Sequence, residues 1–473
     1  MTRTAAILEQ LRRYESRNIT FVDPKGSWPI VWSRARGVHV WDVEGRKYLD
    51  LTAAFGVAAA GHANPRVIRA AQRQMGQLLH AMGDVHPHAL KARLARTLSE
   101  LTFERWAQEL AANRTHSATR RSSGGRTPKH VSPERSAHAR AGGHGKVIFC
   151  NSGFEAVEAA LKTALLVTKK AGVIAFEGAY HGTGYGTLNT THRQEFRGPF
   201  RSQLAAFGQF VPFPVGTADL DRVLTRVQQR LRRRTVGAVL VEPVQARGGI
   251  RVAPPSFLAG LRDLCNEHEA LLIVDEVFTG FGRTGAWFGC DHFGVRPDLI
   301  CLGKALTGGF PLSACVGTAR LMDAAWPLCQ GEAIHTSTYL GHPVGCAMAM
   351  AQIDEIKRGD LVAHSRDLGA WLLTALQSGL AGAPIRTSVR GLGLMVGVEI
   401  TERKEAHVTR QTWMLIKQML HRGYLILPEG AHGQVAAFTP PLVIRPAQLA
   451  GAVQTFCELF DGPMRLSRRE GRV

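Results

Sequence analysis

Three polar groups stand where apolar strands of the sequence should end, and their types suit one kind of chemistry. The strand expected over 271–277 is apolar until Asp275 and Glu276, and a carboxylate at the end of a buried strand needs a partner. Lys304 directly follows another apolar segment, DLICLG. Ser152 and Gly153 precede an amphipathic helix, and the first backbone N–H groups of a helix are unpaired and attract anions.

These groups together match what pyridoxal 5'-phosphate requires of a protein. A helix N-terminus near Ser152 and Gly153 can bind the phosphate, Asp275 can bond the pyridinium nitrogen, and Lys304 can form the Schiff base. Each residue alone also has a plain structural interpretation, Asp275 as a helix cap or salt bridge and Lys304 as a surface lysine. The combination is what favours a cofactor site. To act near neutral pH, Lys304 would need a pKa below its usual value of about 10.4.

Competing motifs predict other chemistry. Residues 280–285, GFGRTG, fit the G-x-G-x-x-G pattern of a Rossmann oxidoreductase that binds a nicotinamide cofactor. However, Asp275 and Glu276 stand where such a strand should turn tightly, and AWFGCDHFG does not open an amphipathic helix. His86 and His88 lack a third ligand at metal-site spacing, so no metal is expected. No Walker A, H-E-x-x-H or G-x-S-x-G motif occurs.

The elements around these residues alternate between apolar strands and helices. The segments KVIFC, GVIAF, GAVLVEPV, LLIVDEV and DLICLG are separated by helical patterns, which predicts an α/β fold with a mostly parallel sheet and helices on both faces. Such sheets bind ligands at the carboxyl ends of their strands. A long Ala/Met-rich helix is expected from about Thr336, and GLMVGVEI and TPPLVI are expected as strands of a C-terminal lobe.

Composition excludes several classes of protein. Of the 473 residues, 45% are hydrophobic and 20% are charged, as in a globular protein. The sequence contains no run of 18 uncharged apolar residues, so no membrane span is expected. The eight cysteines contain no C-x-x-C pair, which favours reduced thiols in the cytoplasm. The net charge is +20, but residues 113–145 alone carry seven basic residues and one acid. That stretch has no aromatic residue to stack on bases, so we expect a disordered basic insertion and no nucleic-acid partner.

Nearly the whole chain resembles the class III aminotransferases, which are fold type I pyridoxal-phosphate enzymes that include ornithine, acetylornithine, 4-aminobutyrate and ω-amino acid transaminases. The resemblance is carried, in family order, by VWDVEGRKYLD, GHANP, NSGFEAVEAALKTA, AYHG, VEPVQ, VDEVFTGFGRTG, LGKALTGGFP, HTSTYLGHPVGCA and GLGLMVGVE. It implies a homodimer with shared active sites. It also implies a smaller α+β lobe built from both ends of the chain, with residues 1–70 and 336–473 flanking a large cofactor-binding domain over 71–335.

The resemblance assigns roles to individual residues. Lys304 would form the Schiff base and carry the proton, and Asp275 would keep the ring nitrogen protonated. Tyr180 and Val277 would pack on the two faces of the ring, with His181 beside it and Glu242 near it. The phosphate would be held by Ser152, Gly153, the Phe154 amide and Thr338 of the neighbouring subunit, and Phe55 would line the pocket.

Several positions depart from the best-known members of the family. Phe154 and Phe278 replace a small or hydroxyl residue and a glutamine, respectively. Ala437 stands where ornithine and 4-aminobutyrate enzymes have a carboxylate-binding arginine, and Arg247 stands where they have its gating glutamate. One hypothesis is that Arg247 now binds the substrate carboxylate from the opposite wall, since a guanidinium can form a bidentate pair. The alternative is that it points to solvent or to a neighbouring acid.

These departures favour an amine or ω-amino acid as donor over ornithine, with a 2-oxo acid such as pyruvate or 2-oxoglutarate as acceptor and a ping-pong mechanism. An aminomutase, a racemase or a decarboxylase of the same family remains an alternative, because the Lys304 and Asp275 machinery serves all of them.

Overall fold

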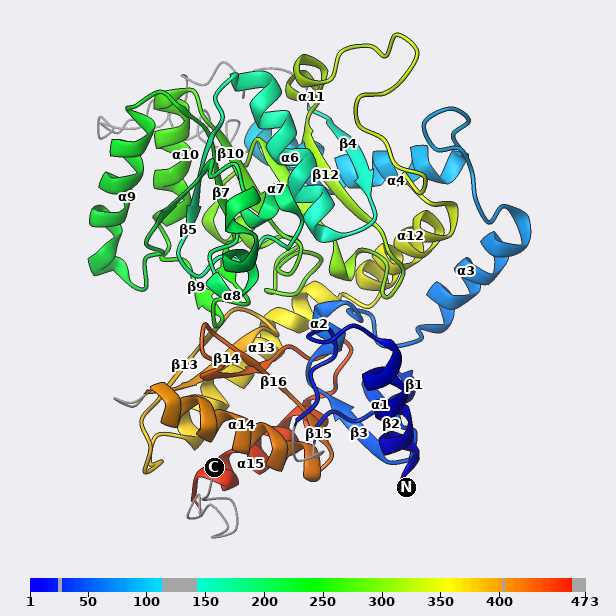
Figure 1. The fold of residues 1–473 in the computed structure, drawn as a ribbon, viewed down its shortest axis with the longest axis vertical. Coiled ribbons are helices and arrows are strands. Elements are labelled where there is room, and N and C mark those ends of the chain that lie inside the picture. Colours follow the sequence, from blue (N-terminus) through cyan, green and yellow to red (C-terminus); the bar gives the residue numbers. More distant parts are fainter. Residues whose placement is uncertain (24–27, 113–142, 402–404, 462–473) are drawn as a thin grey trace, which may run out of the picture.

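The computed structural model describes residues 1–23, 28–112, 143–401 and 405–461. The predicted insertion over 113–145 lies outside these residues except at its end, where Gly145 begins the first strand of the central sheet. The larger domain and a smaller one lie one above the other in Figure 1, and the first described helix, Arg3–Tyr14, and the last one, Pro446–Asp461, both belong to the smaller domain.

The larger domain is built on a seven-stranded sheet in the order β4-β12-β11-β10-β7-β5-β6. Only β12 runs antiparallel to its neighbours, so the sheet is mostly parallel, as predicted. The carboxyl ends of β4, β11, β10, β7 and β5 therefore lie along one edge. The strands are β4 (Gly145–Cys150), β5 (Gly172–Phe176), β6 (Gly208–Val211), β7 (Val236–Val241), β10 (Leu271–Asp275), β11 (Leu299–Leu302) and β12 (Ser313–Thr318).

Helices cover both faces of this sheet (Figure 1). Side chains alternate along a strand, so Leu271 and Ile273 of β10 join the apolar cluster under helix α6, whereas Leu272 and Val274 join the main core on the other face. The helices of this part of the chain are α3 (Pro65–Gln77), α4 (Ala89–Ser99), α6 (Gly153–Thr168), α7 (Tyr185–Leu188), α8 (Gln194–Arg197), α9 (Thr217–Leu231), α10 (Phe257–His268), α11 (Ala319–Ala325) and α12 (Pro343–Arg358).

The smaller domain joins segments from both ends of the chain. One sheet has the order β1-β2-β3-β15, in which β15 from the C-terminal part pairs with β3 from the N-terminal part. The other has the antiparallel order β13-β14-β17-β16. The strands are β1 (Trp32–Arg36), β2 (His39–Asp42), β3 (Lys47–Asp50), β13 (Thr387–Gly391), β14 (Val396–Ile400), β15 (Tyr424–Leu425), β16 (Leu427–Glu429) and β17 (Val435–Phe438). The helices are α1 (Arg3–Tyr14), α2 (Ala53–Gly56), α13 (Leu361–Gly379), α14 (Glu405–His421) and α15 (Pro446–Asp461). A two-stranded pair, β8 (Val244–Gln245) with β9 (Arg251–Val252), follows β7.

Two sequence predictions about these elements were wrong in detail. The strand expected at TPPLVI is absent, because β17 ends at Phe438 and the two following prolines have no N–H to donate to a ladder. The helix expected from about Thr336 begins only at Pro343, where the Nδ1 of His342 accepts a hydrogen bond from the N–H of Val344 at 3.2 Å. Proline suits the first helical position because the N–H there is unpaired in any case.

Candidate active site

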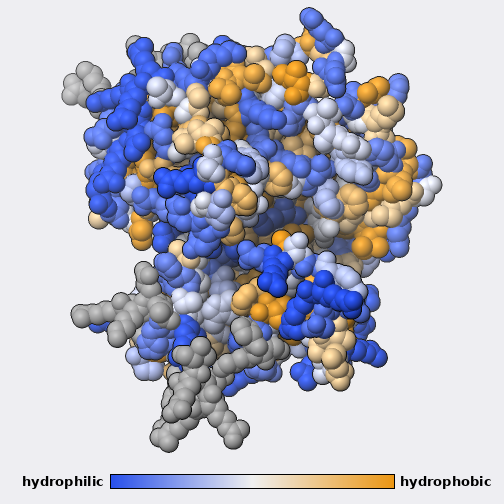
Figure 2. Space-filling view, in the orientation of Figure 1, coloured by the Kyte–Doolittle hydropathy of each residue, from blue (hydrophilic) through white to orange (hydrophobic). Residues whose placement is uncertain are grey.

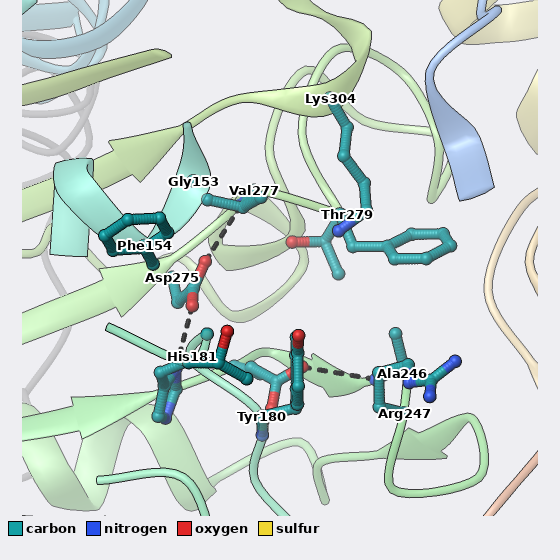
Figure 3. A pocket seen from close by; sticks show the side chains of 14 residues that line it. Gly153, Phe154, Tyr180, His181, Ala246, Arg247, Asp275, Val277, Thr279 and Lys304 are labelled. Atoms are coloured by element: carbon teal, nitrogen blue, oxygen red, sulfur yellow. Dashed lines mark hydrogen bonds and ion pairs between the residues drawn. The ribbon is translucent and has the colours of Figure 1, made fainter. Parts of the chain in front are cut away.

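A cavity of about 240 Å³ opens at the carboxyl edge of the central sheet. Figure 3 shows Lys304 reaching into it from one side, with Tyr180 and His181 across from it. Nine of the twelve residues predicted from the sequence line this cavity: Gly153, Phe154, Tyr180, His181, Glu242, Arg247, Asp275, Val277 and Lys304.

Asp275 is the last residue of β10, and each of its two carboxylate oxygens has a hydrogen-bond partner in the chain. Its Oδ2 lies 2.8 Å from the Nδ1 of His181, and its Oδ1 accepts a hydrogen bond from the N–H of Val277 at 3.0 Å (Figure 3). The carboxylate is 5% exposed. These bonds hold it in one orientation, and the Nε2 of His181 is itself buried without a partner in the described chain. A buried, oriented carboxylate suits a cationic ring nitrogen.

Lys304 follows β11 in a short 3-10 helix, Lys304–Leu306. Burial lowers the pKa of its ammonium group, Asp275 and Glu242 act in the opposite direction, and Arg247 adds a smaller lowering effect. The Nζ atom lies 4.7 Å from the ring centroid of Phe278. The uncharged form of a lysine amine can act as a nucleophile or a base, and a lowered pKa favours that form.

The start of helix α6 has the properties of a phosphate site. The Oγ of Ser152 is buried and has no hydrogen-bond partner among the described residues. A Cβ added at Gly153 would lie 2.7 Å from the Cγ1 of Val277, so only glycine allows the backbone to approach at this point. The unpaired N–H groups of the first turn and an unused hydroxyl together fit an anion such as the phosphate of pyridoxal 5'-phosphate.

Glu242 and Tyr180 lie next to each other at the ends of β7 and β5. Glu242 accepts hydrogen bonds from the N–H of Tyr180 at 3.0 Å and from that of Ala246 at 3.3 Å. Burial raises its pKa to about 7, whereas His181 acts to lower it. The ring of Tyr180 packs edge-on against Phe196. The hydrogen bond that Glu242 accepts from the N–H of Tyr180 fixes the backbone that presents Tyr180 to the cavity.

Arg247 is paired with an acid that sequence reasoning missed. Its Nη1 lies 3.7 Å from the Oε2 of Glu429, which ends β16 and is 5% exposed. Burial raises the pKa of Glu429, while Arg247 and Arg193 lower it. Arg193 in turn donates hydrogen bonds from Nη2 to the carbonyl oxygens of Arg247 and Gly430. The Oε2 of Glu429 has no hydrogen-bond partner in the described chain, so the pair with Arg247 is a long ionic contact.

Three predicted site residues do not line the cavity. Ser152 directly precedes Gly153 of the lining, and its buried Oγ has no hydrogen-bond partner among the described residues. Phe55 belongs to α2 and is 48% exposed. Thr338 is exposed on the loop before α12.

The glycines of GFGRTG serve packing between the two domains. The segment is followed by a 3-10 helix of five residues, Gly289–Phe293, and not by an α-helix. Arg283 is fully buried, and its Nη1 donates hydrogen bonds to the carbonyl oxygens of Leu394 and Pro440. A Cβ at Gly285 would lie 2.8 Å from the Cα of Arg366. The dinucleotide interpretation of this motif therefore has no structural support, because a Rossmann pyrophosphate needs a helix N-terminus at that place.

Two features are absent from the described ranges. There, no helix is long and apolar enough to cross a membrane. In the same residues, no group of three His, Cys, Asp or Glu side chains is arranged to hold a metal ion.

The fold and the site together define a pyridoxal-phosphate-dependent transferase of fold type I. The model of the family Aminotransferase class-III matches residues 21–460, and the chain belongs to this family. Enzymes of the family use pyridoxal 5'-phosphate, so the resemblance seen in the sequence and the cofactor inferred from it are both confirmed.

The particular relatives have several substrates. The chain is 33% identical over 428 residues to the acetylornithine aminotransferase of Methanosarcina mazei, and the matched region covers 90% of this chain and 91% of that protein. It is 32% identical over 444 residues to the 5-aminovalerate aminotransferase of Pseudomonas aeruginosa, covering 92% and 94%. Among solved structures, the ornithine aminotransferase of Toxoplasma gondii superposes with a TM-score of 0.79 at 26% identity, covering 97% and 95%.

Proposed function

We propose that this aminotransferase moves an amino group from an amine or an ω-amino acid to a 2-oxo acid by a ping-pong route. The observation that carries the proposal is that one cavity contains both a buried lysine of lowered pKa, Lys304, and a guanidinium, Arg247. The lysine suits amino-group chemistry, and the guanidinium suits the carboxylate of an acid substrate.

The residues around the cavity have distinct tasks in this proposal. Bound pyridoxal 5'-phosphate supplies the aldehyde that accepts the amino group and the ring that takes up negative charge. Asp275, oriented by His181, keeps the ring nitrogen protonated. Lys304 takes the proton from the substrate carbon and returns it, and the lowering of its pKa by burial favours this role. The binding residues would be Ser152, Gly153, Phe154, Tyr180, His181, Glu242 and Val277.

Arg247 is the proposed carboxylate-binding residue. Its guanidinium lines the cavity, its ion pair with Glu429 is 3.7 Å long, and its side chain remains 29% exposed. A contact of that length makes no hydrogen bond, so most of the donors of Arg247 stay free for a carboxylate. The two alternatives from the sequence are thus combined, because Arg247 faces a neighbouring acid and the cavity at once.

A homodimer is part of the proposal. The loop that carries Thr338 packs on the segment after α3, where Thr336 donates a hydrogen bond to Asp84 and the Nε2 of His88 lies 2.7 Å from the carbonyl oxygen of Gly341. Exposed hydrophobic atoms gather on this side of the large domain in Figure 2, and contiguous apolar surface of this kind marks an interaction site. The exposed residues there include Leu78, Leu79, Met82, Val85, Ile334 and Tyr339. A second copy on this surface would bring Thr338 to the partner's cofactor site.

The cytoplasm is the proposed location. All eight cysteines are free thiols, and six of them are buried. Buried free thiols are typical of proteins kept in a reducing compartment.

Two experiments test the function. Borohydride reduction of the cofactor-loaded protein, followed by digestion, should recover a pyridoxyl label on the peptide that contains Lys304. A label on another lysine, or none, would refute the role of Lys304. A screen of amines, ω-amino acids and α-amino acids against pyruvate and 2-oxoglutarate should then show amino transfer. Release of carbon dioxide, a racemised product or a shifted amino group without an acceptor would instead indicate a decarboxylase, a racemase or an aminomutase.

A further inference from the structure

The aromatic ring of Phe278 lies over the amine of Lys304. Nζ is 4.7 Å from the ring centroid, within the distance of about 6 Å at which a cation is attracted to the face of a ring. Phe278 is buried, and it belongs to an apolar cluster that includes Val244 of the large domain and Met395 and Val435 of the small domain. Residues of both domains therefore hold the ring in place.

A glycine packs against this ring at van der Waals distance. A Cβ added at Gly56 would lie 3.0 Å from the Cε1 of Phe278 and 3.4 Å from its Cδ1 and Cζ. Gly56 also has a φ of +81°, which residues with a side chain rarely adopt. Any larger residue at this position would push the ring away from its present place.

The turn that ends in Gly56 is strained. Ala53, Ala54 and Phe55 have φ values of 46°, 49° and 61°, and the left-handed region is unfavourable for every residue that has a Cβ. None of these three is asparagine, aspartate or glycine, which tolerate it best. Strain of this kind persists where surrounding structure enforces it, and it gathers at functional sites.

Hydrogen bonds that begin at the carboxylate of Asp50 hold this turn in place. Its Oδ1 accepts hydrogen bonds from the N–H of Thr52 at 2.8 Å and from its Oγ1–H at 2.6 Å, and its Oδ2 lies 2.7 Å from the Nε2 of His62. The Oγ1 of Thr52 then accepts a hydrogen bond from the N–H of Ala54 at 3.1 Å. The turn also packs against the segment Lys304–Leu306. A chain of contacts thus runs from Asp50 through the turn to the ring and to the lysine.

We propose that Phe278 is a positioning residue for Lys304, and that the left-handed turn Ala53–Gly56 holds Phe278 in that role. The ring face attracts the ammonium form of Lys304 and directs Nζ into the cavity, while the bulk of the ring keeps water away from it. The inference depends on the proposed function only in assigning the covalent chemistry to Lys304.

The test follows the uptake of pyridoxal 5'-phosphate by cofactor-free protein as a function of pH. The uncharged amine is the reactive form, so the uptake rate rises with pH around the pKa of Lys304. In Phe278→Leu the site stays apolar but the attraction for the ammonium is lost, so the midpoint should fall by about 0.5 to 1.5 pH units. Phe278→Tyr keeps the ring face and should keep the midpoint of the unchanged protein. Met395→Leu is the matched control, because Met395 belongs to the same apolar cluster but does not line the cavity.

Gly56→Ala gives an independent test, because it displaces the ring without changing it. The pH midpoint of its cofactor uptake should fall, as it does in Phe278→Leu. The thermal midpoint of unfolding of Gly56→Ala is measured in parallel, to show that the variant is folded. The proposal is overturned if Phe278→Leu and Gly56→Ala both keep the unchanged midpoint, or if Met395→Leu shifts it equally. Failure of the unchanged protein to bind the cofactor through Lys304 would instead refute the proposed function.

Discussion

Replacement of Arg247 by alanine should weaken the binding of acid substrates and spare a simple amine donor. The guanidinium lines the cavity and has free donors, since its contact with Glu429 is 3.7 Å long. A hydrogen bond between charged groups contributes about 1.5 to 3 kcal/mol. Loss of one such interaction lowers kcat/KM for the 2-oxo acid about 10- to 100-fold. An amine without a carboxylate makes no such contact, so its half-reaction should stay within about twofold.

Glu429→Gln should raise kcat/KM for the 2-oxo acid, the constant that Arg247→Ala lowers. Two unit charges 3.7 Å apart attract by about 1 kcal/mol in water and by about 4 kcal/mol at an effective dielectric constant of 20. A carboxylate that enters the cavity competes with this attraction for Arg247. Removal of the Glu429 charge should therefore raise kcat/KM for the acid at least about fivefold, the factor that corresponds to the lower figure of about 1 kcal/mol.

The assay combines steady-state rates with pyruvate and 2-oxoglutarate and a single-turnover measurement with the amine donor alone. Arg197→Ala is the matched control, because this arginine packs its guanidinium on Phe210 at 4.8 Å and does not line the cavity. The reasoning is refuted if Arg247→Ala leaves kcat/KM for both acids within twofold of the unchanged enzyme. It is also refuted if Arg247→Ala slows the amine half-reaction as much as the acid half-reaction.

Three further predictions concern the cofactor site and its support. Asp275→Asn should weaken pyridoxal 5'-phosphate binding about 10- to 100-fold, because a charged hydrogen bond to the ring is lost; titration of cofactor fluorescence measures this, and an unchanged Kd would contradict it. Gly153→Ala places a Cβ 2.7 Å from Val277, so the same titration should show at least about tenfold weaker binding. Burial raises the pKa of Glu276 to about 7 from 4.5, so the folded protein holds this proton more tightly than the unfolded chain and stability falls as pH rises from about 4.5 to about 7. Glu276→Gln should remove up to about 3 kcal/mol of this loss in the free energy of unfolding. Urea unfolding of the cofactor-free protein at pH 5 and at pH 8 measures it, and an equal loss in the variant and the unchanged protein would contradict the prediction.

The position of the reactive residues was predictable from the sequence because parallel strands end at one edge. Asp275 and Lys304 are far apart in the chain, yet β10 and β11 are neighbours, and Asp275 pairs in register with Cys301. Ser152 follows β4, which runs parallel to β11 on the far side of β12. Strand order did not need to be known, since every carboxyl end in such a sheet faces the same region.

The residues that sequence reasoning missed depend on contacts between distant loops. Glu429 ends a strand of three residues, and it reaches Arg247 through the pairing of β16 with β17 and a backbone hydrogen bond from the N–H of Gly430 to the carbonyl oxygen of Arg247 at 3.2 Å. Arg193 lies outside any motif, and it contributes through hydrogen bonds to two backbone carbonyl groups. The left-handed turn at residues 53–55 gave no signal either, because Ala-Ala-Phe carries none of the residue types that normally mark positive φ.

The pairing of Arg247 with Glu429 has a consequence for an enzyme that alternates between two substrates. In a ping-pong route the donor and the acceptor occupy one cavity in turn, and an amine donor has no carboxylate to neutralise a cation there. A lone arginine that is partly buried, as Arg247 is, would then be costly to desolvate. Because Glu429 stays beside it, Arg247 remains neutralised when the amine is bound and is available when the acid arrives. Loss of Glu429 should therefore slow the amine half-reaction while it favours the acid, and this opposite response separates a shared charge pair from a merely structural salt bridge.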